Sequence, residues 1–190
     1  MNENLSTEAN VVVAATAVVA ADVKFTGPFT VTIGEGTVIH PKCEFRSLSG
    51  PIIVGNDNIF EERSIIENSQ EGTEDKPSED LVIGSNNVFQ VDSQFKGNVA
   101  GDANVFEAKS LVDVGCRVGT GCVVGHSAKL SEEKELMDSH VAYRFNSFTQ
   151  GMETDQVFIR SAKRLKEHNL SELSSYLPKM QEIIAKQQQG

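Results

Sequence analysis

Residues 112–130 read VDVGCRVGTGCVVGHSAKL, and an apolar residue recurs at every sixth position, at Val112, Val118, Val124 and Leu130. The same spacing returns in four earlier runs of the chain, which begin at positions 33, 54, 83 and 100. A period of six fits neither an α-helix nor a simple hairpin sheet, whose side chains repeat every 3.6 and 2 residues. It is typical of a parallel β-helix built from hexapeptides, with one short strand and one turn in each repeat.

Three hexapeptides make one triangular coil, so the repeats group by eighteen. The leading, inward-pointing residues divide into six coils, at positions 13/19/25, 33/39/45, 54/60/66, 83/89/95, 100/106/112 and 118/124/130. Each leading side chain is expected to stack on its counterpart in the next coil, about 4.8 Å away. The second column then carries Phe60, Phe89 and Phe106 in succession. We therefore predict an all-β solenoid whose core consists of stacked apolar columns.

The fourth residue after each leading position is predicted to be small and to point inward near a corner. Asn58, Asn87 and Asn104 occupy this position in three successive coils. We expect them to form a stacked amide ladder in which both ends of each side chain are satisfied by its neighbours. Such a ladder would also fix the register of the coils, because an unpaired buried amide costs about 1–3 kcal/mol.

The three cysteines of the chain, Cys43, Cys116 and Cys122, fall at the same inward position of the repeat. No Cys-x-x-Cys pair is present. We interpret them as small buried hydrophobic residues and not as redox or metal-binding groups. This interpretation fits a reducing, cytoplasmic compartment.

Two segments depart from the period. Residues 67–80 are rich in Asp and Glu, and we predict that they leave the prism at a corner as an acidic loop, either solvated or in contact with a partner. The β-helix is predicted to span residues 10–150, with a final strand at residues 140–143 that caps its open end. Residues 151–190 are predicted to form a C-terminal helical extension.

Within this extension, apolar residues recur three or four positions apart from Asp155 onward, which predicts helix. A second helix is expected to begin at a cap on Ser171 and to be kinked or divided at Pro178. Its apolar stripe is more typical of packing on the chain's own domain than of a partner contact. Residues 186–190 are expected to be disordered.

The 190-residue chain is acidic, with a formal net charge of −10 and a pI of about 4.9. A nucleic-acid or anionic-membrane surface needs a basic patch, so the composition argues against both. The apolar run at residues 11–21 is too short to span a bilayer. It follows acidic and not basic residues, which argues against a signal peptide.

Hexapeptide prisms resemble either acyltransferases or trimeric zinc carbonic anhydrases, and the zinc site can be tested on the histidines. A catalytic zinc needs three protein ligands and one open position. Within the repeat only His40 and His126 are available, and they fall about four coils, or roughly 19 Å, apart along the axis. We predict no metal site.

An acyltransferase of this architecture would use one histidine as general base, with coenzyme A along the prism. His126 is the best-placed residue for that role because it falls at a turn. A base needs a positioned substrate and usually an orienting carboxylate, and neither is identifiable; Arg117 and Lys129 do not make a phosphate-binding cluster. His140 and His168 lie beyond the repeat with no recognisable constellation. We therefore predict no catalytic or cofactor-binding residue, and keep a homotrimeric, coenzyme A-dependent acyltransferase as the alternative.

Several ordered strings carry a more specific resemblance. They are VTIGEGTVIHPKC at residues 31–43, GPIIVGNDNIFEE at 50–62, IGSNNVFQV at 83–91 after the acidic segment, GDANVFEAK at 101–109, GCVVG at 121–125 and YLP at 176–178. Together they resemble the dynactin subunit 6 family over residues 10–180. The chain departs from the family pattern after Gly151, where residues 157–168 look more helical than the family's proline-richer connection.

The resemblance implies a left-handed parallel β-helix that serves as a non-catalytic structural subunit. It implies a place in the pointed-end complex of dynactin, beside dynactin subunit 5, an actin-related protein and a larger subunit. Members of this complex cap a short filament in the cytoplasm and help to recruit cargo adaptors for dynein-driven microtubule transport. The resemblance does not identify which residues bind which partner.

Overall fold

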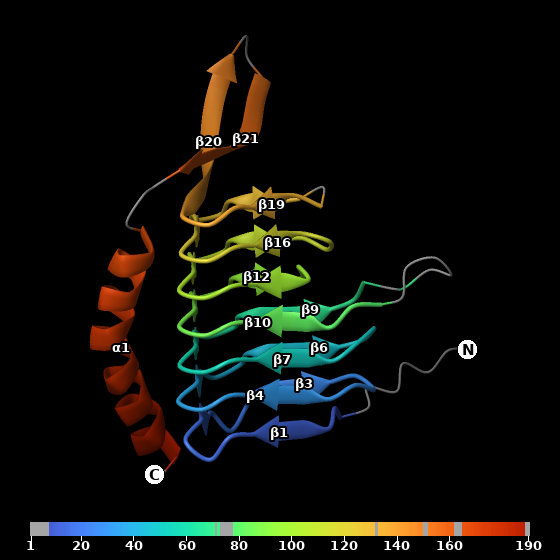
Figure 1. Cartoon of the computed structure of the whole chain (residues 1–190), viewed down its shortest axis with the longest axis vertical. Helices are drawn as coiled ribbons and strands as arrows, with labels where there is room; N and C mark the ends of the chain where they lie inside the picture. Colours follow the sequence, from blue (N-terminus) through green and yellow to red (C-terminus); the bar gives the residue numbers. More distant parts are fainter. Residues whose placement is uncertain are drawn as a thin grey trace.

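The computed structural model describes residues 8–70, 72, 78–131, 133–149, 152–161 and 165–188. The chain forms a three-sided parallel β-helix whose coils stack along the long axis of the molecule (Figure 1). One helix, α1 (Leu165–Gln188), lies along the side of the prism, and a hairpin rises beyond the last coil. The predicted fold class, a hexapeptide-repeat β-helix of about six coils with a C-terminal helix, is confirmed.

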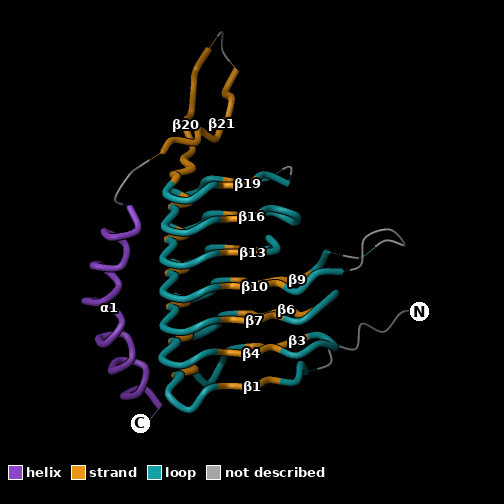
Figure 2. Tube along the Cα trace, viewed as in Figure 1, coloured by secondary structure: helices purple, strands orange, loops and turns teal. Residues whose placement is uncertain are grey.

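Each side of the prism is one sheet, and Figure 2 shows how its short strands alternate with turns. The first sheet contains β1 (Val11–Val13), β4 (Val31–Ile33), β7 (Ile52–Val54), β10 (Leu81–Ile83), β13 (Val99–Ala100), β16 (Arg117–Val118) and β19 (Glu135–Leu136). The second contains β2 (Val18–Val19), β5 (Val38–Ile39), β8 (Ile59–Phe60), β11 (Val88–Phe89), β14 (Val105–Phe106), β17 (Val123–Val124), β20 (His140–Thr149) and β21 (Met152–Ser161). The third contains β3 (Lys24–Thr26), β6 (Glu44–Ser47), β9 (Ile65–Asn68), β12 (Gln94–Phe95), β15 (Leu111–Val112) and β18 (Lys129–Leu130).

The strand register aligns the leading residues as the period predicts. In the second sheet Phe60 lies opposite Phe89, and Phe89 lies opposite Phe106. In the first sheet Val54 lies opposite Ile83, although the acidic segment separates them in sequence. The six predicted coils are therefore present, and β19 with the first part of β20 begins a further turn.

The core of the prism is built on stacked phenylalanines. The Phe60 and Phe89 ring centroids lie 4.7 Å apart at an interplanar angle of 9°, and those of Phe89 and Phe106 lie 4.4 Å apart at 8°. All three side chains are buried. Stacked aromatic pairs add about 0.5–1.5 kcal/mol each beyond the area they bury, so this column stabilises the register as well as the core.

The predicted asparagine ladder is present, but its hydrogen bonds differ from the expectation. The backbone N–H of Asn87 donates to Asn58 Oδ1 at 2.9 Å, and that of Asn104 donates to Asn87 Oδ1 at 2.9 Å. Only Asn87 also donates through its own amide to the preceding rung, at 3.0 Å. Asn104 Nδ2 has no hydrogen-bond partner in the described part of the chain. The side-chain oxygens therefore fix the coils mainly through the backbone.

The acidic segment begins later than predicted. Glu67 and Asn68 belong to β9 and are buried. Glu67 pairs with Arg46 at 2.9 Å and with Lys96 at 3.3 Å. Burial alone would raise the pKa of Glu67, but the contacts with Arg46, Ser69 and Lys96 hold its pKa below the ordinary value. Residues 71 and 73–77 of the segment lie outside the described residues.

The prediction that a helix begins at Asp155 is wrong, because residues 152–161 form the strand β21. This strand pairs antiparallel with β20 over ten residues, and β20 in turn pairs parallel with β17. The strand at residues 140–143 that was predicted to cap the open end is the first part of β20. β21 forms because it pairs with the otherwise open edge of that strand, and tertiary pairing outweighs the helical spacing. The domain limits at 150 and 151 stay a prediction; they fall between the two strands of this hairpin.

The helix is also simpler than predicted. α1 runs without interruption from Leu165 to Gln188, so Pro178 does not divide it and Ser171 lies inside it, not at a cap. α1 is bowed along the prism (Figure 1), and apolar contacts with the second sheet lie on both sides of Pro178. Residues 186–188, expected to be disordered, are helical, and Lys186 pairs with Glu182. Residues 189 and 190 lie outside the described residues.

The two ends of the prism differ. At the N-terminal end β1, β2 and β3 are the outermost strands of their sheets. There the leading residue Val13 is 44% exposed, whereas its counterparts Ile33 and Val54 are buried. At the other end the β20–β21 hairpin stands beyond the last coil (Figure 1). The hairpin therefore extends the second sheet alone, whereas β19 and β18 are the last strands of the first and third sheets at that end.

Candidate interaction surfaces

His126 is the residue on which the acyltransferase alternative depends. This residue is exposed at a corner. The nearby carboxylate of Glu107 accepts a hydrogen bond from the backbone N–H of His126 at 2.7 Å. This hydrogen bond orients the turn, and in the described part of the chain no hydrogen bond joins the His126 imidazole to a carboxylate that could poise it as a general base.

His40 occupies a different environment. It is 8% exposed, and its Nε2 has no hydrogen-bond partner among the described residues. Burial lowers the pKa of His40, while the carboxylates of Glu61 and Glu62 oppose that shift in part. The Nδ1–H of His140 donates to the backbone carbonyl of Asp138 at 2.9 Å. His40 and His126 lie in the second and sixth coils, well separated along the prism axis, as the repeat predicts.

The cysteines are buried inside the prism, as the sequence predicts. Burial raises the pKa of the Cys43 thiol to about 11 and also raises those of Cys116 and Cys122. Such thiols stay protonated near neutral pH and are poor nucleophiles. Among the described residues, no three His, Cys, Asp or Glu side chains are grouped so that they could hold a metal ion.

The outer face of the second sheet carries an apolar column, formed by the residue before each leading position: Val18, Val38, Ile59, Val88, Val105, Val123 and Val141. α1 lies on this column. Leu173 packs with Ile59 and Val88, and Ile184 packs with Val38. Four apolar residues of the helix pack against this column and follow one another at three or four positions: Leu173, Leu177, Met180 and Ile184. The helical pitch of about 5.4 Å is close to the coil spacing of about 4.8 Å, which suits this packing.

Polar contacts fix α1 along the prism. The Tyr176 hydroxyl donates to Glu61 Oε1 at 2.9 Å, and the Gln181 amide donates to the carbonyl of Gly36 at 2.9 Å. Near the start of the helix, buried Asn169 donates to the carbonyl of Ala103 at 2.8 Å. Burial, followed by the nearby Glu61 carboxylate, raises the pKa of Tyr176 to about 12. The hydroxyl therefore stays a donor, and the helix is held at several coils.

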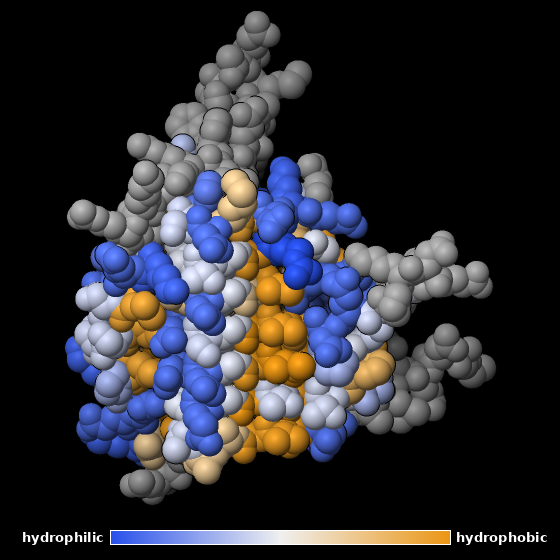
Figure 3. Space-filling view, viewed as in Figure 1, coloured by the Kyte–Doolittle hydropathy of each residue, from blue (hydrophilic) through white to orange (hydrophobic). Residues whose placement is uncertain are grey.

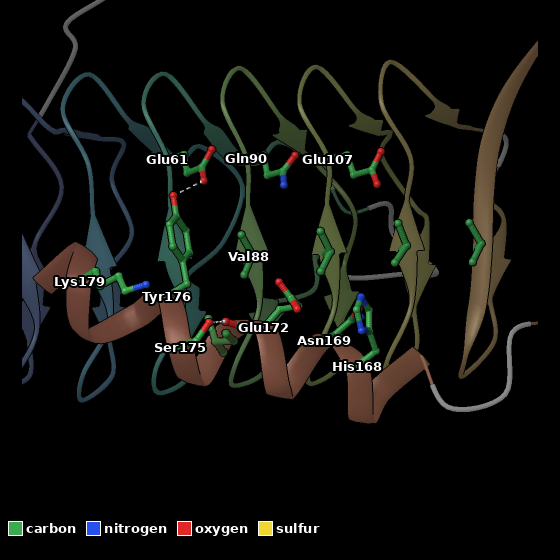
Figure 4. A pocket seen from close by; sticks show the side chains of 14 residues that line it. Glu61, Val88, Gln90, Glu107, His168, Asn169, Glu172, Ser175, Tyr176 and Lys179 are labelled. Atoms are coloured by element: carbon green, nitrogen blue, oxygen red, sulfur yellow. Dashed lines mark hydrogen bonds between the residues drawn. The ribbon is translucent and has the colours of Figure 1, made fainter.

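A groove of about 590 Å³ remains between the N-terminal half of α1 and the second sheet. Its floor is the upper part of the apolar column, formed by Val88, Val105, Val123 and Val141. In Figure 4 one wall is a row of corner residues, Glu61, Gln90 and Glu107, and the facing wall is α1 with His168, Glu172, Tyr176 and Lys179. The Tyr176–Glu61 hydrogen bond crosses the groove near one end.

The outer face of the first sheet also carries apolar side chains, but no helix lies on it. Val12 is 52% exposed, Ile53 39% and Val82 37%, and Val99 continues the column. Figure 3 shows an orange stripe down the middle of the molecule, broken near its lower end by a paler patch. At its upper end the outward residues become charged, with Arg117 on β16 and Glu135 on β19.

The third sheet presents a charged outer face. Glu44 lies between Lys24 and Arg46, at 3.6 and 2.5 Å, and Arg46 also contacts Glu67. The hydrogen bond from Arg46 lowers the pKa of Glu44. Of the two basic residues that seemed isolated in the sequence, Lys129 pairs with Asp113 and Arg117 with Glu79. The charged residues of this face, Lys24, Glu44, Arg46 and Lys129, therefore have charged partners and lie beside the apolar Ile65 and Leu111, whereas Arg117 belongs to the first sheet.

The inward positions were readable from the sequence, but the two outer apolar columns were missed. A signal for them was present: the residue before each leading position in the first two sheets is mostly Val or Ile, so these strands are apolar on both faces. Strands that are buried on both faces read in this way. The pattern could have predicted that at least one outer face is covered.

In the described part of the chain, no helix has both the length and the apolar character needed to cross a bilayer. No protein-family model matches the chain. Among curated proteins, it is 34% identical over 139 residues to a dynactin subunit 6 of Danio rerio, a match that covers 70% of each chain. A dynactin subunit 6 of Xenopus tropicalis is 34% identical over 138 residues, covering 70% of this chain and 68% of the relative.

A dynactin subunit 6 of Nematostella vectensis is 38% identical over 117 residues, and there the chain spans just under two thirds, 64%, of the relative's length. Among solved structures, the chain is similar to a Bacillus cereus protein described as a candidate acetyltransferase, with a TM-score of 0.67, 17% identity and 94% of each chain covered. It is also similar to a hexapeptide transferase family protein from Anaplasma phagocytophilum, with a TM-score of 0.69, 13% identity and 90% of each chain covered. At these identities the structural likeness concerns the fold alone.

Proposed function

The chain belongs to the dynactin subunit 6 family, and from this premise we propose that it is a non-catalytic structural subunit of the dynactin pointed-end complex. In this proposal it binds dynactin subunit 5 and lies in the same assembly as the actin-related protein and the larger subunit. It acts in the cytoplasm, on the cytoskeleton. There it supports dynein-driven microtubule transport and the recruitment of cargo adaptors.

One observation carries the proposal beyond the family relationship: a rigid prism leaves an apolar column uncovered along the outer face of its first sheet (Figure 3). Ile53 and Val82 lie side by side in one row on the adjacent strands β7 and β10, whereas Thr32 on β4 separates them from Val12. Contiguous exposed apolar surface of this kind is typical of a protein–protein contact. A solenoid held by its own core also loses little conformational freedom when it binds, which suits a scaffold.

The second candidate function is a homotrimeric acyltransferase that uses coenzyme A. It is favoured by the fold, which the chain shares with the two transferase-like structures. It is disfavoured by the surroundings of His126, where Glu107 is engaged by the backbone N–H and not by the imidazole. The family relationship and the missing base arrangement together support the structural role over this alternative.

Co-expression of the full chain with dynactin subunit 5 tests the proposal. We expect the two to copurify, and we expect Ile53→Asp to abolish copurification because it places a charge in the middle of the uncovered column. Ile65→Asp, on the outer face of the third sheet, is the matched control and should leave copurification intact. Circular dichroism of each variant would check that it is folded.

The acyltransferase alternative predicts a different set of results. A chain that sediments as a stable homotrimer, binds coenzyme A and fails to copurify with subunit 5 would overturn the structural role. His126→Ala would then be expected to abolish acyl transfer.

A further inference from the structure

The groove beside α1 is built from the same column that the helix covers elsewhere. Over the lower coils, Leu173 and Ile184 bury Val88 and Val38. Toward the upper coils the column continues with Val105, Val123 and Val141, which are only half-buried. There the helix faces the groove with polar residues such as His168 and Glu172 (Figure 4). The apolar floor of the groove therefore extends further along the prism than the apolar residues of α1 that could cover it.

The dimensions of this floor suit a short peptide segment. The three half-buried valines, Val105, Val123 and Val141, lie on successive coils and span two coil spacings, or about 10 Å. An α-helix repeats its apolar face about every 5.4 Å, and α1 already uses that match on the coils below. The groove volume of about 590 Å³ has room for the apolar side chains of two to three helical turns, but not for a large domain.

The charges around the floor favour a basic occupant. Glu107 stands on the corner wall and Glu172 on the helix wall, on opposite sides of the valines (Figure 4). Glu61 is occupied at both oxygens, by the Tyr176 hydroxyl and by the backbone N–H of Val91. Lys179 is the one Lys or Arg among the described lining residues, so carboxylates outnumber cations around the groove.

We propose that this groove binds a short amphipathic segment of a partner subunit, with apolar side chains one helical turn apart and with Lys or Arg beside them. The apolar side chains rest on Val105, Val123 and Val141 and extend the interface that α1 begins. The basic side chains lie between Glu107 and Glu172. This inference rests on the proposed function, because it takes the partner from the same assembly, but it concerns a surface separate from the first-sheet column.

Photo-crosslinking in the reconstituted complex tests the groove. The full chain, with benzoylphenylalanine in place of Val123, is assembled with dynactin subunit 5, the actin-related protein and the larger subunit, irradiated and mapped by mass spectrometry. We expect one partner segment of apolar and basic residues to be crosslinked. The same crosslinker at Gln94, on the outer face of the third sheet, is the control position and should not capture that segment.

Charge reversal gives a second readout. Glu172→Lys should lower the crosslinking yield from position 123 at least fivefold, because it replaces a wall carboxylate with a cation. Glu182→Lys makes the same charge change on the same helix, away from the groove, and should leave the yield unchanged. Raising the salt concentration to 0.5 M should also lower the yield, because it screens the charge attraction.

The outcomes separate the groove from the proposed function. If the subunits assemble but position 123 captures only α1, a second copy of this chain or an acidic segment, the groove proposal is overturned while the structural role stands. An equal yield from the wild-type chain and Glu172→Lys would overturn the charge complementarity. If the subunits do not assemble at all, the proposed function itself fails.

Discussion

The first and second sheets carry similar apolar columns on their outer faces, yet only the second is covered by the chain itself. On the second sheet, Ile59 and Val88 are buried beneath Leu173 of α1. On the first sheet, the corresponding Ile53 and Val82 remain exposed. The six-residue period specifies the inside of the prism, but the outside of each strand is free to vary. The comparison teaches that in a solenoid the outer residues report what lies against each face, from the same chain or from another.

The largest loss of stability is expected from a substitution in the core of the prism, which supports both sheets. Phe89→Ala opens a cavity in the middle of the phenylalanine column, between Phe60 and Phe106, and should lower the free energy of unfolding by about 3–5 kcal/mol. Urea unfolding followed by circular dichroism measures it. A loss below about 1 kcal/mol would show that the coils are not held by this stack.

A smaller loss of stability is expected from a substitution that weakens the packing of α1 on the second sheet. Leu173→Ala should cost about 2–3 kcal/mol, because a buried leucine loses its contacts with Ile59 and Val88. Ile53→Ala, at the equivalent height on the uncovered first sheet, should cost less than about 1 kcal/mol. Equal losses in the two variants, measured by the same urea titration, would contradict the difference between the faces.

The hydrogen bond between α1 and the prism should contribute still less to the free energy of unfolding. Tyr176→Phe keeps the ring and removes the hydroxyl that donates to Glu61, which should cost about 1–2 kcal/mol. Amide hydrogen exchange would localise the effect, with faster exchange expected in α1 and unchanged exchange in β11 and β14. Uniformly faster exchange throughout the prism would mean that the helix and the coils unfold as one unit.

The smallest effect is a pH dependence from His40, beneath the C-terminal half of α1. Burial holds the pKa of His40 below 6.5, so between the folded pKa and about 6.5 the unfolded chain binds more protons than the folded one. The free energy of unfolding should therefore rise with pH through this window and fall as pH drops below about 6.5. Glu61, Glu62 and Tyr176 also line this site.

His40→Gln should remove that slope. The comparison is made between urea titrations of the wild type and the variant from pH 5.0 to 7.5. This range stays above the window in which Glu44 and Glu67, whose pKa values are lowered in the folded chain, lose their contribution. A variant with the same pH slope as the wild type would show that His40 does not carry it.

Most of the prism could be predicted because each inward position answers to one local constraint. A leading residue must be apolar to stack, and the residue four positions later must be small to fit a corner, as Phe89 and Ser93 illustrate. These constraints repeat in every coil, so the coil index and strand register followed from spacing alone. The resemblance to the dynactin subunit 6 family was likewise carried by strings within the coils, and the similarity to curated members supports it.

The parts that could not be predicted depend on contacts between distant segments. β21 is a strand because β20 offers it an edge, and α1 stays unbroken at Pro178 because the second sheet holds it on both sides. The local sequence of β21 does not reveal that it pairs with β20, and the local sequence of α1 does not reveal that it packs on the second sheet. The groove was missed for the same reason, because Val123 and Glu172 come together only when the helix folds back along the prism.

The hairpin at one end of the prism gives the molecule a direction as a building block. β20 and β21 project past the last coil, so a prism stacked there would meet them, whereas the opposite end presents β1, β2 and β3, of which β3 already pairs in part with Glu8 and Ala9. The two ends of the prism are therefore unlike, so a neighbour stacked on one end would contact β20 and β21, and a neighbour stacked on the other end would contact the first coil.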